Sequence, residues 1–167
     1  MTTTQIKLLT HADIANKIKR MAYEIYENNI SENELLLVGL DERGYKLAQI
    51  LSNELSNFSE WKCSLHHLKM DRTNLLNEGK LQDEKLDLTN KTIVLIDDVL
   101  DSGKTLFYAL KYFMNFNVAK ITTVVLVDRS HRKFPVHADI VGLSLSTTMQ
   151  DHISVTFETG NFSAVLK

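Results

Sequence analysis

Apolar residues recur at helical spacing in three stretches of the chain. From Thr10 to Asn29 they fall at steps of three and four, which predicts a helix with one buried face, and Thr10 is suited to cap it. A second helical stretch follows Gly44, and a third follows Gly103. The apolar positions of the three stretches are Ile14, Ile18, Met21, Ala22 and Ile25; Leu47, Ala48, Leu51 and Leu55; and Leu106, Phe107, Leu110, Phe113 and Met114.

Short apolar runs without alternation lie between the helical stretches. Residues 35–38 and 92–96 are typical of strands buried on both faces, and further strands are predicted at 61–68 and 121–127. Because strands alternate with helices, we expect a parallel sheet with right-handed crossovers and helices on both faces. Shorter strand-like pieces at 139–145 and 152–157 predict a small C-terminal hood. The predicted fold is a single α/β domain over residues 1–167.

Residues 69–90 interrupt this alternation with many charged side chains and weak periodicity. Connections of this length without structure of their own are uncommon in compact domains and often serve as lids or binding loops. We interpret the segment as a flexible flap; the alternative is a solvated connection.

Composition narrows the classes of protein that need to be considered. The chain has 167 residues, 44% of them hydrophobic, and a net charge of −2, so no global field attracts nucleic acid or an anionic membrane. Cys63 is the single cysteine, which excludes an intrachain disulfide framework and favours a reducing compartment. No apolar run is long enough to span a bilayer or to form a signal peptide, so we expect a cytoplasmic protein without a membrane partner.

The stretch from Ile93 to Thr105 contains the residues most suited to chemistry. An apolar strand delivers Asp97 and Asp98 to its carboxyl end, where open α/β sheets bind ligands. The turn Ser102-Gly103-Lys104-Thr105 then opens a helix, and such a turn offers backbone N–H groups and hydroxyls to a phosphate. A Walker A loop is excluded because Asp98 occupies the position of its first glycine.

This arrangement suits a ribose phosphate, with the turn on the phosphate and the two carboxylates on the sugar hydroxyls. We expect these carboxylates to be exposed at the strand end. The alternative is that they only cap the following helix.

The same stretch resembles the signature of type I phosphoribosyltransferases, which bind 5-phosphoribosyl 1-pyrophosphate (PRPP). Residues 38–44 (VGLDERG) are similar to the family's pyrophosphate loop, and residues 126–132 (LVDRSHR) resemble the branch of pyrimidine-operon attenuators and uracil phosphoribosyltransferases. The resemblance implies an enzyme of nucleotide salvage that transfers a phosphoribosyl group from PRPP to a nucleobase and requires Mg²⁺. It also implies a homodimer.

The resemblance also implies a role for each part of the site. The 5′-phosphate would be held by Ser102, Gly103, Lys104 and Thr105. The pyrophosphate would be held by Asp41, Glu42, Arg43 and Gly44. The ribose and, indirectly, the metal would be held by Asp97 and Asp98. Lys69 and Arg72 of the flap would close over the pyrophosphate.

Four residues depart from the patterns of this family and its branches. Asp101 stands where an aromatic residue is usual, and it matches the aspartate that hypoxanthine-guanine and xanthine enzymes use as a base or hydrogen-bond acceptor. Asp128 stands where those enzymes place a nucleobase-binding lysine. Asp41 and Glu42 replace a basic and a small hydroxyl residue, and their charge is unfavourable beside pyrophosphate unless they face away. Because of Asp101, we favour a 6-oxopurine over uracil as the nucleobase.

Two further groups have alternative interpretations. Arg129, His131, Arg132 and Lys133 would suit RNA phosphates or a ligand on the nucleobase side, but such loops are more often solvated turns. They support a second hypothesis, a PRPP-responsive RNA-binding regulator with little catalysis, against which the balanced charge argues. His66 and His67 lack partners at metal-ligand spacing and are interpreted as polar residues at a strand end.

Overall fold

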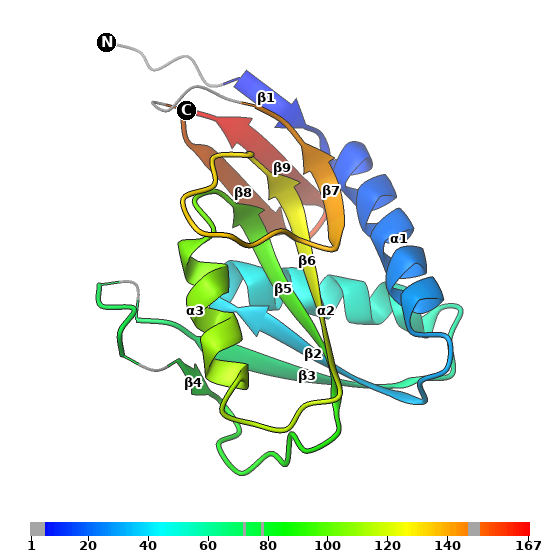
Figure 1. Ribbon diagram of the computed structural model, residues 1–167. Coiled ribbons are helices and arrows are strands. Elements are labelled where there is room, and N and C mark those ends of the chain that lie inside the picture. Colours follow the sequence, from blue (N-terminus) through cyan, green and yellow to red (C-terminus); the bar gives the residue numbers. More distant parts are fainter. Residues whose placement is uncertain (1–5, 72, 78, 147–150) are drawn as a thin grey trace.

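The computed structural model describes residues 6–71, 73–77, 79–146 and 151–167 (Figure 1). Its larger sheet has six strands in the order β4-β3-β2-β5-β6-β7, and only β4 runs antiparallel to its neighbour. The strands are β2 (Glu34–Leu40), β3 (Lys62–Lys69), β4 (Lys80–Leu81), β5 (Thr92–Leu100), β6 (Lys120–Asp128) and β7 (Ile140–Ser144). This confirms the α/β fold with a mostly parallel sheet.

Helices cover both faces of this sheet, as expected (Figure 1). The helices are α1 (His11–Asn28), α2 (Asp41–Ser56) and α3 (Lys104–Phe113). One apolar core joins α1 and α2 to the sheet, and a second joins α3 to the opposite face. Successive strand residues point to opposite faces, so Val94 enters the first core and Leu95 the second. The apolar runs show no alternation because each face has a core to fill.

The hood is a second sheet, of three antiparallel strands in the order β1-β9-β8. Its strands are β1 (Ile6–Leu9), β8 (Ile153–Glu158) and β9 (Asn161–Leu166), and β8 contacts α2 and β5. The predicted C-terminal hood is present; the piece at 152–157 corresponds to its strand β8, whereas the piece at 139–145 contains β7 of the larger sheet. The hood also includes β1, which comes from the other end of the chain and pairs with β9 (Figure 1). No local signal in four residues reveals such a long-range pairing.

The first helix begins as predicted, whereas the second begins earlier. Thr10 and Asp13 form a reciprocal capping box at α1. Residues 40–44, predicted as a turn before the second helix, are instead its entry and first turn. The chain turns at a single residue, Asp41, which adopts φ 50°. The acidic pair Asp41 and Glu42 complements the positive end of the helix dipole.

The charged segment 69–90 divides into two parts. The flap loop lies between β3 and β4 within residues 70–79, and its described residues, 70–71, 73–77 and 79, project from the sheet (Figure 1). The remainder is anchored, since Leu81 and Leu88 are each 2% exposed and belong to the second core. In the described residues, no helix is long and apolar enough to cross a membrane.

Candidate functional site

The site lies where the order of strands reverses. From β2 the chain proceeds to β3 and β4 on one side, and from β5 to β6 and β7 on the other, so the switch point falls between β2 and β5. Ligands bind at such points, beyond the carboxyl ends of the strands. The loops that follow β2 and β5 are the two that resemble PRPP-binding loops.

Strand β5 extends beyond β2 and so opens a cavity. Its pairing with β2 ends at Gly39↔Ile96, whereas its pairing with β6 continues to Leu100↔Asp128. A cavity of about 210 Å³ lies here. It is lined by Arg43, Asp97, Asp98, Val99, Leu100, Asp101, Ser102, Gly103, Lys104, Thr105, Leu106, Arg129, His152 and Ile153.

Asp97 and Asp98 stand at the inner wall of this cavity. Each is 5% exposed, so the prediction of exposed carboxylates was wrong: β6 and the surrounding loops enclose the strand end. The Asp97 Oδ1 accepts a hydrogen bond from the Asp98 amide at 2.9 Å, and the Asp98 Oδ2 lies 3.7 Å from Nη1 of Arg43. Burying carboxylates at a cavity costs free energy, which a polar ligand can offset.

The phosphate turn is shaped by Gly103. This residue adopts φ 81°, in the left-handed region, and a Cβ there would lie 2.6 Å from the Val136 side chain. The Ser102 carbonyl accepts hydrogen bonds from the Lys133 and Phe134 amides, which hold the turn from behind. The first amides of α3, which have no intrahelical partner, lie beside the cavity with the positive end of the helix dipole.

In the pyrophosphate loop, only Arg43 lines the cavity. Asp41 is turned toward the flap, where its Oδ1 accepts a hydrogen bond from the Met70 amide at 2.9 Å. Asp41 and Glu42 are absent from the cavity lining. Gly44 is buried and packs against the Ile96 carbonyl.

The two flap residues are not part of the cavity lining. Lys69 is exposed at the end of β3, next to the residue that Asp41 holds. Arg72 lies outside the described residues. Their predicted closure over pyrophosphate remains a prediction.

Asp101, in the turn before α3, contacts two residues of the loop after β6. Asp101 has a half-exposed side chain, with Oδ2 3.2 Å from Nη1 of Arg129 and Oδ1 3.7 Å from Nδ1 of His131. A second cavity of about 280 Å³ adjoins the first. The two cavities share Asp101, Ser102 and Arg129, so the Asp101–Arg129 pair forms part of the wall between them.

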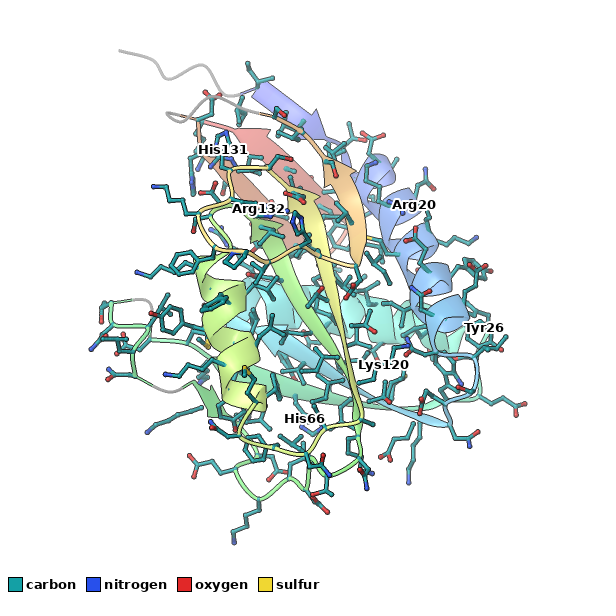
Figure 2. All side chains as sticks on the ribbon, viewed as in Figure 1. Arg20, Tyr26, His66, Lys120, His131 and Arg132 are labelled. Atoms are coloured by element: carbon teal, nitrogen blue, oxygen red, sulfur yellow. The ribbon has the colours of Figure 1, made fainter. Side chains whose placement is uncertain are left out.

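The loop after β6 is not a solvated turn. Arg129 is 3% exposed, and Arg132 pairs with Asp128 and donates to the Val136 carbonyl at 2.7 Å. Burial alone would raise the pKa of Asp128, but hydrogen bonds from the Arg132 side chain and the Ser130 amide hold it below its ordinary value. His131 and Arg132 lie close together at the hood end of the molecule, far from His66 (Figure 2).

Sequence reasoning identified neither the hood's contribution nor the buried arginine. His152 and Ile153 line the cavity from the hood, which no local motif signals. The sequence identifies Arg129 as a candidate ligand-binding residue, but its burial depends on contacts across the fold.

His66 and His67 both contact neighbouring side chains. The His66 Nε2 lies 3.0 Å from the Ser64 hydroxyl, and burial lowers the pKa of the imidazole. His67 stacks on Tyr45. Among the residues that the structure describes, no group of three or more histidine, cysteine or acidic side chains is arranged to hold a metal ion alone.

Comparisons with known proteins identify the family of this chain. The model of the phosphoribosyl transferase domain family matches residues 5–159. The bifunctional protein PyrR of Leuconostoc citreum is 35% identical over 159 residues, 91% of this chain and 91% of that protein. The PyrR of Haemophilus ducreyi is 33% identical over 149 residues, 84% and 83% of the two chains.

Solved structures share the fold at lower identity. The hypoxanthine phosphoribosyltransferase of Trypanosoma cruzi, in complex with its product IMP, has a TM-score of 0.74 and 22% identity, over 84% of this chain and 76% of that one. A hypoxanthine-guanine phosphoribosyltransferase of Bacillus anthracis has a TM-score of 0.70 and 18% identity, over 86% and 84%. With the motif of residues 93–105 placed at the switch point of this fold, the chain belongs to the phosphoribosyl transferase family, as a phosphoribosyltransferase related to the PyrR proteins.

Proposed function

We propose that this phosphoribosyltransferase transfers the phosphoribosyl group of PRPP to a nucleobase and releases pyrophosphate. The observation that carries the proposal is the pairing of two buried carboxylates, Asp97 and Asp98, with the phosphate turn at Gly103 across one cavity. A sugar phosphate offers hydroxyls to the two carboxylates and anionic phosphate oxygens to the turn.

Each end of PRPP has suitable partners. The turn from Ser102 to Thr105 receives the 5′-phosphate, and Asp97 and Asp98 accept hydrogen bonds from the ribose hydroxyls. Arg43 leaves Asp98 for the pyrophosphate, because its side chain is 52% exposed and their ion pair is long. Asp41, Glu42 and Gly44 shape the backbone of that loop, and Lys69 and Arg72 approach from the flap.

The transfer breaks the bond from the anomeric carbon to the pyrophosphate oxygen and forms a bond from that carbon to a ring nitrogen. The electron pair of the broken bond leaves with pyrophosphate, and the ring nitrogen loses a proton. Asp101 is placed to accept that proton or its hydrogen bond. Arg43 and the loop amides stabilise the charge that develops on pyrophosphate.

Magnesium fits this site only together with PRPP. Mg²⁺ prefers oxygen ligands and usually takes one or two carboxylates plus substrate phosphates. Asp97 and Asp98 offer carboxylates at the cavity, and PRPP would bring the remaining oxygens, with the aspartates acting through the ribose hydroxyls. When bound, the ion would neutralise charge on the departing pyrophosphate.

For the nucleobase we propose a 6-oxopurine, with uracil as the second candidate. Asp101 favours the purine because it matches the aspartate that hypoxanthine-guanine and xanthine enzymes use as a base or hydrogen-bond acceptor. The relationship to PyrR favours uracil, the base of the branch that residues 126–132 resemble.

The rival function is a PRPP-responsive RNA-binding regulator with little catalysis. The exposed cation of Lys133, together with His131 and Arg132, lines the open second cavity and favours it. In either role we propose a cytoplasmic homodimer that acts in nucleotide salvage or in its control; light scattering tests the dimer.

One incubation distinguishes these functions. The protein is mixed with PRPP, magnesium and, in turn, guanine, hypoxanthine, xanthine, uracil and orotate, and pyrophosphate release is measured, with chelator controls. We expect release with hypoxanthine or guanine. Release with uracil alone would identify the second candidate. PRPP binding by calorimetry without release from any base would favour the regulator, and no PRPP binding by folded protein would overturn both.

A further inference from the structure

Arg129 joins three parts of the site. Its amide donates to the Leu100 carbonyl of β5 at 2.9 Å, and its Nη1 lies 3.2 Å from Asp101 in the turn before α3. Its Nη2 donates to the carbonyl of Asp151, just before the hood strand β8, at 2.6 Å. One side chain therefore connects the nucleobase side of the cavity to the hood.

The burial of Arg129 makes these contacts obligatory. The side chain is 4% exposed, and a buried guanidinium is strongly unfavourable unless its charge and its N–H groups have partners. Its charge partner, Asp101, is 50% exposed and faces both cavities. Arg129 thus has little freedom to move, while the carboxylate that it holds remains accessible to a ligand.

Arg132 provides a comparison within the same loop. It also pairs with an aspartate, Asp128, but its partners Asp128 and Val136 are near in sequence. Arg132 lines only the second cavity, whereas Arg129 also lines the first. The two arginines share chemistry and location but differ in their connection to the proposed catalytic site.

We propose that Arg129 is a positioning residue for the transfer: it fixes the Asp101 carboxylate toward the nucleobase and, through the Asp151 carbonyl, holds the hood over the same base. The inference rests on the proposed function. A nucleobase then meets a carboxylate with a fixed direction, which accepts a hydrogen bond from a ring N–H.

Kinetics of pyrophosphate release test the positioning role. Arg129→Met should raise the KM for the nucleobase and lower kcat/KM by at least tenfold, while the Kd of PRPP from calorimetry stays within about threefold. Arg129→Lys, which keeps the charge but cannot span both partners, should recover part of the loss. Arg20→Met is the matched control, because Arg20 lies outside both cavities and also joins an acidic side chain to backbone carbonyls; it should change neither constant by more than about threefold.

A double variant distinguishes positioning from a general structural effect. If Arg129 acts through Asp101, Arg129→Met should lower kcat/KM less in an Asp101→Asn background than in the wild type. An equal loss in both backgrounds, or a tenfold loss of PRPP affinity in Arg129→Met, would overturn the proposal.

Hydrogen exchange provides a readout that needs no activity. In ligand-free, folded Arg129→Met, the amides of β8 (Ile153–Glu158) should exchange faster than in the wild type, while those of β2 keep their rates. Unchanged β8 exchange would remove the hood from the proposal. Failure of the wild type to bind PRPP would overturn the proposed function and leave this measurement of the Arg129 connection intact.

Discussion

Asp98 illustrates how a single residue reports on function. It lies near the carboxyl end of β5, with a carboxylate that is 5% exposed, and its ion pair with Arg43 is long and half open to solvent. Exposed or partly exposed ion pairs contribute little to stability, so this contact does not explain the burial of the charge. We propose that the hydroxyls of a bound ligand account for it.

Asp98→Asn should therefore weaken PRPP binding by at least tenfold, because the amide offers one acceptor instead of two and carries no charge. Calorimetry with magnesium measures this. Glu34→Gln, which breaks the remote pair with Lys91, is the control and should leave the Kd unchanged. Loss of the folded state in Asp98→Asn would instead identify Asp98 as structural.

Residues of the site were predictable to the extent that their role is local. Asp97, Asp98 and the turn at Gly103 follow one strand within a few positions, so a pattern of residue types was enough. The Asp101–Arg129 pair joins two loops across β5 and β6, and the exposure of Asp98 depends on neighbours far along the chain. Such features depend on tertiary packing, which no short pattern contains.

At the scale of elements, the ends of helices and strands connect the site to the frame. The capping box at Thr10 links β1 of the hood to α1, and the hydrogen bond from Met70 to Asp41 links the flap loop to α2. Strand and helix positions were predictable from periodicity. Strand β1 was not, because its pairing partner β9 lies at the opposite end of the chain. Strand β9 was also missed, although it forms a hairpin with the neighbouring strand β8.

Thr10→Ala should lower the free energy of unfolding by about 1 kcal/mol, since it leaves N-terminal amides of α1 without a side-chain acceptor. Urea denaturation measures the loss. Thr10→Ser retains the hydroxyl and should stay within about 0.5 kcal/mol of the wild type. An equal loss in both variants would attribute the effect to the methyl group of threonine.

Asp71, at the base of the flap loop, should lose its proton at a lower pH than an ordinary aspartate. Hydrogen bonds from the Thr73 side chain, the Asn77 side chain and the Asn74 amide lower the pKa of Asp71 from 3.8 to about 2. Because the folded pKa is the lower one, the stabilisation of this turn is fully present above pH 3.8 and is lost as the pH falls through about 2. NMR titration of the Thr73 and Asn74 amides should give a midpoint near 2; a midpoint near 3.8 would contradict the bonding pattern.

The flap loop should become protected when ligand binds. Limited proteolysis of the free protein is expected to cleave within residues 70–79, and PRPP with magnesium should slow that cleavage, because Lys69 and Arg72 would close over pyrophosphate. Cleavage elsewhere in the chain serves as the internal control. Equal rates with and without ligand would identify an ordinary loop.

At the scale of the whole molecule, two apolar cores share one sheet. Leu51 lies in the core under α2 and Phe113 in the core under α3, and both are fully buried. Because β2, β5 and β6 contribute residues to both cores, neither core can be lost while the other stays intact. The chain should therefore unfold as one cooperative unit.

Leu51→Ala should cost about 2–5 kcal/mol and Phe113→Ala about 3–5 kcal/mol, and each should move the entire unfolding transition. Far-ultraviolet and near-ultraviolet circular dichroism, recorded during the same denaturant titration, check this. Exposed Met114→Ala is the control and should change little. Separate transitions in either variant would show two units instead of one domain.

The glycines that bound the pyrophosphate loop limit how this protein can diversify. A Cβ at Gly39 would lie 2.2 Å from the Tyr45 Cα, and one at Gly44 would lie 2.6 Å from the Ile96 carbonyl oxygen. A saturation library across this loop should therefore tolerate almost nothing at either glycine and much at Glu42, whose side chain is exposed. The path of the backbone is fixed, so laboratory evolution of pyrophosphate affinity has only side-chain chemistry with which to work.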